Sequence, residues 1–213
     1  MKKYRPLLLL VVLLMTMPLQ GCVEMAAVGV GAAAMSVLDR RTTGTQVEDE
    51  GIELRASNRI NERFRDKVHV NVTSYNRNVL VTGEAPDQKT SAEIEKIVLS
   101  VSNVRGATND LQIGGIASYT SRASDATITG KVKARFVDAD KFNALHVKVV
   151  TESSVVYLLG IVTEGEAAAA VEIARTTGGV RKVVKVFDYC KPTDPVCAPR
   201  EKPKAEEPKK SGK

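Results

Sequence analysis

The residues most capable of chemistry in this 213-residue chain are three cysteines and two histidines. A thiol can be acylated, oxidised to a disulfide or bound to a metal, and an imidazole can transfer a proton or bind a metal. The sequence around them shows no Ser-His-Asp set, phosphate-binding loop or cluster of metal ligands. We therefore predict no catalytic residue, no cofactor and no metal, and an enzyme is the function class that the sequence favours least.

Cys22 follows a segment typical of secretion. A basic stretch, Met1–Arg5, precedes an apolar run, Leu7–Met17, which is too short to span a bilayer but suits a signal peptide. The run ends in Leu19-Gln20-Gly21-Cys22, which resembles the lipobox of bacterial lipoproteins although Gln20 replaces the usual small residue. We predict a signal peptide over 1–21 and acyl chains on Cys22. Because Val23 rather than Asp follows, the resemblance implies sorting to the outer membrane, facing the periplasm. The alternative is an ordinary signal peptide with an incidental cysteine.

Cys190 and Cys197 form the remaining pair. They are separated by Lys-Pro-Thr-Asp-Pro-Val, a turn-prone linker, and a secreted protein is exposed to an oxidising compartment. We predict a local disulfide between them, the alternative being two reduced thiols. Metal binding is disfavoured because no histidine or further cysteine lies nearby in the sequence.

The segments outside the body of the chain are unlike it in composition. Residues 22–44 begin with a stretch rich in Gly and Ala, predicted to be a membrane-proximal spacer; a short transmembrane helix is the alternative, which Glu24 disfavours. Residues 191–213 are rich in Pro, Lys and Glu, which predicts a disordered tail. Residues 22–190 carry as many acidic as basic side chains, so the high overall pI is weak evidence for nucleic acid, which we do not expect as a partner.

An internal repeat organises the body. VHVNVTSYNRNVLVTG (68–83) and LHVKVVTESSVVYLLG (145–160) align without a gap. Their alternation predicts strands with one buried and one wet face, and the polar centre of each predicts a hairpin turn. His69 and His146 lie at equivalent polar positions, which indicates inheritance by duplication rather than a paired site. Gly83 and Gly160 are interpreted as backbone positions that use the conformational freedom of glycine.

Helical segments flank each predicted hairpin. Apolar residues recur every four positions before it, from Ile52 to Phe64 and from Ile128 to Phe136, and further helical patterns follow Pro86 and Thr163. Last strands are expected over Ala107–Ile113 and Val183–Tyr189. The sequence thus predicts an α+β fold of two tandem α-β-β-α-β domains, over 45–116 and 120–190, each with two helices packed on a three-stranded sheet.

The repeated unit resembles a known family. Each glycine that ends a hairpin is followed by a helix and then by Val104-Arg105-Gly106-Ala107 or Gly179-Val180-Arg181-Lys182-Val183, a pattern similar to the BON domain. Two such units behind a lipobox resemble the dual-BON outer-membrane lipoproteins, over about residues 1–190. The resemblance implies a non-enzymatic protein that binds anionic phospholipid, such as phosphatidylglycerol, through its second BON domain. It also implies that the protein supports envelope integrity and gathers at division sites.

The predicted lipid-binding residues lie on the first helix of the second domain and in the loop after it. They are Thr127, Lys131, Lys133, Arg135, Lys141 and Phe142. Residues 120–190 carry a net charge of +2 and residues 45–116 a net charge of −2, which favours the second domain for an anionic surface. In relatives an aromatic residue stands where this chain has Thr127, so electrostatics should supply most of the affinity. The alternatives are an ordinary solvated helix face and a periplasmic protein-interaction scaffold associated with outer-membrane assembly proteins.

Overall fold

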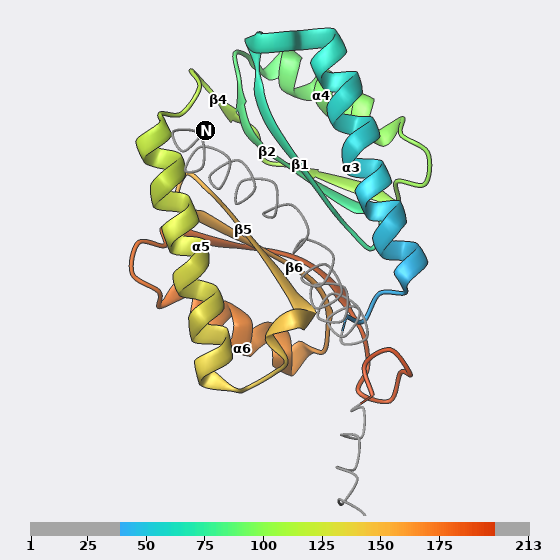
Figure 1. Ribbon diagram of the computed structural model, residues 1–213, viewed down its shortest axis with the longest axis vertical. Coiled ribbons are helices and arrows are strands. Elements are labelled where there is room, and N and C mark those ends of the chain that lie inside the picture. The colour runs from blue at the N-terminus through green and yellow to red at the C-terminus, as the bar shows by residue number, and fades with distance from the viewer. Residues whose placement is uncertain (1–38, 199–213) are drawn as a thin grey trace, which may run out of the picture. The chain divides into compact units, whose positions relative to one another are not determined.

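A computed structural model describes residues 39–198, and both repeats within that range have the α-β-β-α-β order expected from the sequence (Figure 1). The first repeat comprises α3 (Thr43–Phe64), the 3-10 turn η2 (Arg65–Lys67), β1 (His69–Tyr75), β2 (Asn78–Ala85), α4 (Gln88–Leu99), β3 (Gly106–Asn109) and β4 (Gln112–Ile113). The second comprises α5 (Tyr119–Ala139), the 3-10 turn η3 (Ala144–His146), β5 (Val147–Glu152), β6 (Val155–Val162), α6 (Glu164–Arg175) and β7 (Lys182–Tyr189). The predicted α+β fold class is confirmed.

Each sheet is mixed, with its hairpin antiparallel and its last strand parallel. The order is β1-β2-β3 in the first repeat and β5-β6-β7 in the second. The strand expected over Ala107–Ile113 is interrupted after Asn109, where the Leu111 backbone N–H donates a hydrogen bond to the Asn109 side chain. The remainder, β4, pairs with the end of β2 as a short fourth strand.

Both helices of each repeat pack on the same face of its sheet. The apolar residues spaced four apart on α5, Ile128, Val132 and Phe136, are buried against β5, β6 and α6, as predicted. On α3, Ile52, Ala56 and Ile60 are buried in the same way. This spacing places one side chain per helical turn on the sheet, so the pattern alone located both cores.

The opposite face of each sheet is also covered, which the sequence analysis did not predict. Residues 40–198 belong to one compact unit, and a third apolar cluster combines Leu80 of β2 with Tyr157 and Leu159 of β6. The Tyr157 hydroxyl donates to Asp110 of the first repeat at 2.9 Å. The central strands β2 and β6 are therefore buried on both faces. The predicted solvent-accessible face of each hairpin is present only along parts of β1 and β5.

A buried aspartate on the first helix of each repeat holds the hairpin turn. The Asp125 carboxylate accepts hydrogen bonds from the backbone N–H groups of Ser153 and Ser154, both at 2.8 Å. Asp49 accepts in the same way from Asn76 and Arg77, at 2.8 and 2.7 Å. All four turn residues have positive φ, which costs L-residues free energy, so the aspartates stabilise a strained two-residue turn.

The two hairpin-ending glycines are required for different reasons. Gly83 has φ +112°, and a Cβ there would lie 2.1 Å from the His69 carbonyl oxygen. Gly160 lacks a positive φ, so our interpretation of its conformation is wrong. Its constraint is space, because a Cβ would lie 2.4 Å from the carbonyl oxygen of His146, the last residue of η3 before β5.

Candidate functional site

The outward face of α5 is the candidate site. Thr127, Lys131 and Lys133 are exposed on this helix, and Lys141 is exposed two residues after its end. The amino groups of these three lysines form no ion pair or hydrogen bond with any residue that the structure describes. Four of the six predicted residues are therefore exposed, three of them on α5 and one just after it.

Small and apolar side chains form a stripe between the cations. Exposed residues at helical spacing on the side opposite the core are Tyr119, Ala123, Thr127, Gly130, Ala134 and Val137. Tyr119 is 87% exposed and Val137 is 67% exposed. Because successive helical residues turn by about 100°, Lys131 and Lys133 flank this stripe on opposite sides. We define these six residues as the outer stripe of α5.

The outer stripe was not among the predicted site residues, which were chosen mainly for their positive charge. A helical projection of residues 119–137 would have revealed it, since a solvent-facing helix surface is usually charged or polar. The stripe also contains an aromatic side chain, which Thr127 itself does not provide. Tyr119, two turns earlier and near the start of α5, is an exposed aromatic side chain on the same surface.

Arg135 is not available to a ligand in the way we predicted. Its guanidinium donates to the Ile173 carbonyl at 2.8 Å and to the Thr177 hydroxyl at 2.7 Å. These acceptors lie at the C-terminal end of α6, whose last carbonyls lack helical partners. The equivalent Arg59 of the first repeat donates to Ser100, just after α4. The prediction that Arg135 is a free surface cation is therefore wrong. An arginine at the equivalent position of both repeats, Arg59 and Arg135, was the sequence signal of this structural role.

Phe142 is likewise a core residue. Its side chain is 8% exposed, and its ring packs edge-on against Phe136 with 5.0 Å between centroids. The loop after α5 thus turns its aromatic side chain inward and leaves Lys141 outside. The prediction that Phe142 lies at a lipid surface is corrected by this burial.

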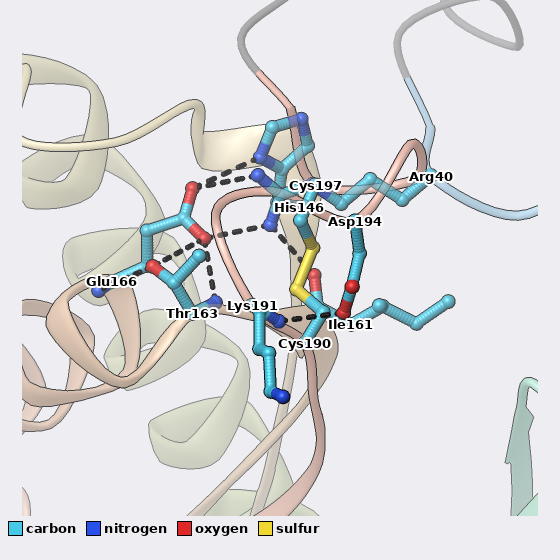
Figure 2. The surroundings of a disulfide bond; sticks show 9 residues. All are labelled: Arg40, His146, Ile161, Thr163, Glu166, Cys190, Lys191, Asp194 and Cys197. Carbon is cyan, nitrogen blue, oxygen red and sulfur yellow. Dashed lines mark hydrogen bonds and ion pairs between the residues drawn. A yellow bond between two sulfur atoms is a disulfide. The ribbon is translucent and has the colours of Figure 1, made fainter.

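The chain enters its folded body through two consecutive arginines. Arg40 reaches the second repeat, where it binds the Glu166 carboxylate and the Ile161 carbonyl (Figure 2). Arg41 reaches the first repeat, where it binds Asp49 at 2.8 Å and lies over the Tyr75 ring. The last residues of the predicted spacer are therefore part of the body. Cys22 itself lies outside the described residues, as do the rest of the spacer, the signal segment and the tail beyond residue 198.

Cys190 and Cys197 are joined in a disulfide, which Figure 2 shows next to Arg40. The disulfide closes a turn in which Asp194 accepts a hydrogen bond from the Lys191 backbone N–H. Cys197 is buried in the cluster that includes Tyr157. The part of the predicted disordered tail that the structure describes, 191–198, is therefore an ordered turn.

The two histidines each lie beside a glutamate. His69 Nδ1 is 3.0 Å from Glu84, and His146 Nδ1 is 3.4 Å from Glu166. The two glutamates do not occupy equivalent positions in the repeats. The histidine environments have therefore diverged although the histidines themselves share a position.

Within residues 39–198, no helix has the length and apolar character needed to cross a membrane.

The comparisons with known proteins agree with the repeat. The model of the family described as the BON domain matches residues 48–115 and 124–191. Outer membrane lipoprotein DolP of Haemophilus influenzae is 38% identical over 177 residues, which cover 82% of this chain and 91% of that protein. A 21 kDa hemolysin of Actinobacillus pleuropneumoniae is 32% identical over 154 residues, which cover 71% and 79%.

A similarity to solved structures is remote. The C-terminal domain of CdsD, a structural protein of the type III secretion system of Chlamydia trachomatis, is 10% identical with a TM-score of 0.28. The match covers 65% of this chain and 96% of that one. At this distance it carries no argument about function.

Proposed function

Because this chain belongs to the BON-domain family, as a dual-BON protein similar to DolP, we propose that it is an outer-membrane lipoprotein that binds anionic phospholipid. Acyl chains on Cys22 anchor it to the periplasmic side of the outer membrane, and its second BON domain contacts the lipid surface. In this position it supports envelope integrity, and it gathers at division sites. It is not an enzyme.

The observation that carries the lipid contact is the outer stripe of α5 with its flanking lysines. A helix that lies in a membrane interface places small and apolar residues toward the acyl region and cations at the level of the headgroups. Lys131 and Lys133 extend from opposite sides of the stripe, so both ammonium groups can reach phosphates while the stripe faces the lipid. Lys141 adds a third cation after the helix ends.

The magnitudes suit an auxiliary contact. Each basic residue near an anionic membrane contributes about 1 kcal/mol, so three lysines contribute about 3 kcal/mol, which corresponds to weak binding by an isolated surface. An acyl anchor in the same membrane raises the effective concentration of the surface and makes a weak contact sufficient. Binding should fall steeply with salt, since exposed charges are screened over about 8 Å at physiological ionic strength.

The test is vesicle flotation of the chain from residue 23 to residue 213. Vesicles that contain phosphatidylglycerol should bind it, and vesicles of zwitterionic lipid alone should bind it weakly. Lys131→Glu combined with Lys133→Glu should weaken binding about tenfold or more. The matched control is Lys182→Glu combined with Lys185→Glu, which reverses two exposed charges on β7 of the same domain.

Equal loss of binding in both double variants would show a nonspecific effect of net charge and would contradict the proposed surface. Thr127→Trp adds an interfacial aromatic side chain to the outer stripe and should strengthen binding to the vesicles.

The acyl anchor on Cys22 is tested separately. Cys22→Ser should remove the protein from the membrane fraction, and mass spectrometry of a mature chain with an unmodified Cys22 would exclude the anchor.

A further inference from the structure

Three potential metal ligands from distant parts of the sequence meet where the two repeats adjoin. His69 of β1 and Glu84 of β2 are directly opposed in the antiparallel ladder, and Glu152 comes from the end of β5 in the second repeat. One nitrogen or oxygen atom from each of the three lies within 4.8 Å of the others. This cluster could not be predicted from the sequence, because its members are up to 83 positions apart.

The two carboxylates of this cluster are buried with little compensation. Glu84 is 4% exposed and Glu152 is 5% exposed. Among the described residues, none donates a hydrogen bond to Glu84 Oε1; Glu84 Oε2 lies 3.0 Å from His69 Nδ1. Asn71 donates to Glu152 at 2.8 Å. Burying two neighbouring carboxylates against one imidazole and one amide is costly, because each ionised group loses its hydration.

Two cations of the second repeat bind other groups. Lys148 is paired with Glu53 at 3.1 Å. Arg122 borders the same depression, but its guanidinium donates to the Ala117 carbonyl and lies over the Tyr119 ring.

We propose that His69, Glu84 and Glu152 form a binding site for a divalent transition-metal ion of the Zn²⁺ class. One imidazole nitrogen with two carboxylate oxygens is a donor set that suits Zn²⁺, whereas Mg²⁺ and Ca²⁺ prefer oxygen ligands alone. Tetrahedral zinc ligands lie about 3.4 Å apart. His69 Nδ1 and Glu84 Oε2, 3.0 Å apart, are close to that spacing. The three ligand atoms lie within 4.8 Å of one another, so Glu152 needs to approach by at most about 1.4 Å.

The site has room for a further ligand and connects the two repeats. His69, Asn71 and Glu152 line an open depression, through which a water molecule can complete the coordination. Because Glu152 belongs to the second repeat and the other two ligands to the first, a bound ion would join the domains. The ion would also be a positively charged partner for Glu84 Oε1, which accepts no hydrogen bond from the described residues.

The second repeat provides an internal control. His146 is the equivalent of His69, but the position equivalent to Glu84 is Ile161. The carboxylate beside His146 is that of Glu166, which Arg40 already neutralises. The two histidines therefore differ in their surroundings, and they are the only two in the chain.

The experiment is calorimetric titration of the chain from residue 23 to residue 213 with ZnCl₂, together with melting curves. This chain keeps every described residue, and its two cysteines are joined in the disulfide, so thiolates do not compete. We expect one bound Zn²⁺ and a higher melting temperature. His69→Gln and Glu152→Gln should each weaken binding by roughly tenfold or more, whereas His146→Gln should bind as the wild type does.

Mg²⁺ and Ca²⁺ in excess should not displace the Zn²⁺. Circular dichroism of each variant verifies that it is folded before titration. The proposal is overturned if the wild-type chain binds no Zn²⁺ at about millimolar concentration. It is also overturned if His69→Gln retains full affinity, or if His146→Gln loses as much affinity as His69→Gln. Lipid binding by α5 does not enter this test, so the two proposals succeed or fail separately.

Discussion

The Arg40 guanidinium binds both oxygens of the Glu166 carboxylate, at 2.7 and 3.0 Å, 126 positions along the chain. The same guanidinium donates to the Ile161 carbonyl at 2.8 Å, and the Arg40 side chain is 8% exposed. Glu166 also closes the capping box of α6 with Thr163. Partial burial alone would raise the pKa of Glu166, but hydrogen bonds from Arg40 and Thr163 outweigh it and lower the pKa to about 2.

Arg40→Ala should therefore destabilise the protein in a pH-dependent way. The folded pKa of Glu166 lies below the ordinary value of 4.5, so its contribution to stability is complete above about pH 4.5 and is lost as the pH falls toward 2. At pH 7 we expect a loss of about 2 kcal/mol, measured by urea unfolding, which shrinks through that window. Arg175→Ala, which removes an exposed pair with Glu172, is the control and should cost far less at either pH.

Asp125→Ala should destabilise the second hairpin by about 2–4 kcal/mol, because two turn N–H groups lose a charged acceptor. Asp138→Ala removes an exposed carboxylate from the same helix and should change stability little. Ser154→Gly should stabilise by about 0.5–1 kcal/mol, since Ser154 has φ 62°. Urea unfolding measures all three, and a neutral Asp125→Ala would exclude the turn-holding role.

Gly160→Ala should cost about 1–3 kcal/mol, because its Cβ would overlap the carbonyl oxygen of His146, just before β5. Gly83→Ala should cost more, since it combines the same overlap with a positive φ. Gly130→Ala is the opposite case. Gly130 lies inside α5 with no neighbouring atom near its added Cβ, so alanine should stabilise by about 1 kcal/mol. Thermal melting of the three variants tests the order.

Arg135→Ala should lower stability by about 1–3 kcal/mol and leave vesicle flotation nearly unchanged, because its guanidinium binds the end of α6 rather than solvent. Lys131→Ala should show the reverse pattern. If Arg135→Ala abolished flotation in a protein of unchanged melting temperature, Arg135 would belong to the lipid surface after all.

Reduction of the Cys190–Cys197 disulfide should lower stability by about 2 kcal/mol, as expected for a short closed loop. Melting curves with and without dithiothreitol measure this difference. The Cys190→Ser, Cys197→Ser double variant should melt like the reduced wild type and should not respond to dithiothreitol.

The sequence predicted the parts of the fold that depend on local pattern. The packed face of α5 was predicted from Ile128, Val132 and Phe136, because the spacing of apolar residues along one helix can be read from a single segment of the sequence. The cluster of Leu80 with Tyr157 was not predicted. The alternation of apolar and polar residues along a strand indicates which side chains face the helices of the same repeat, but not which element covers the opposite face of the sheet.

At the candidate site, too, the features that depend on local pattern were predicted and those that depend on tertiary packing were not. Exposure of Lys131 and Lys133 followed from their place on the helix. The roles of Arg135 and Phe142 did not follow, because they depend on acceptors at Ile173 and Thr177 and on the ring of Phe136, which only tertiary packing brings near. The Arg40–Glu166 pair was invisible for the same reason.

The burial of Leu80 together with Tyr157 and Leu159 also constrains how this protein can evolve. A duplicated module that keeps its own free surface can drift, be copied or be transferred to another gene alone. Here each module supplies part of the other's interior, so a substitution at Leu80 changes the selection on Leu159. We therefore expect relatives of this chain to carry compensating substitutions across the shared sheet faces rather than independent ones.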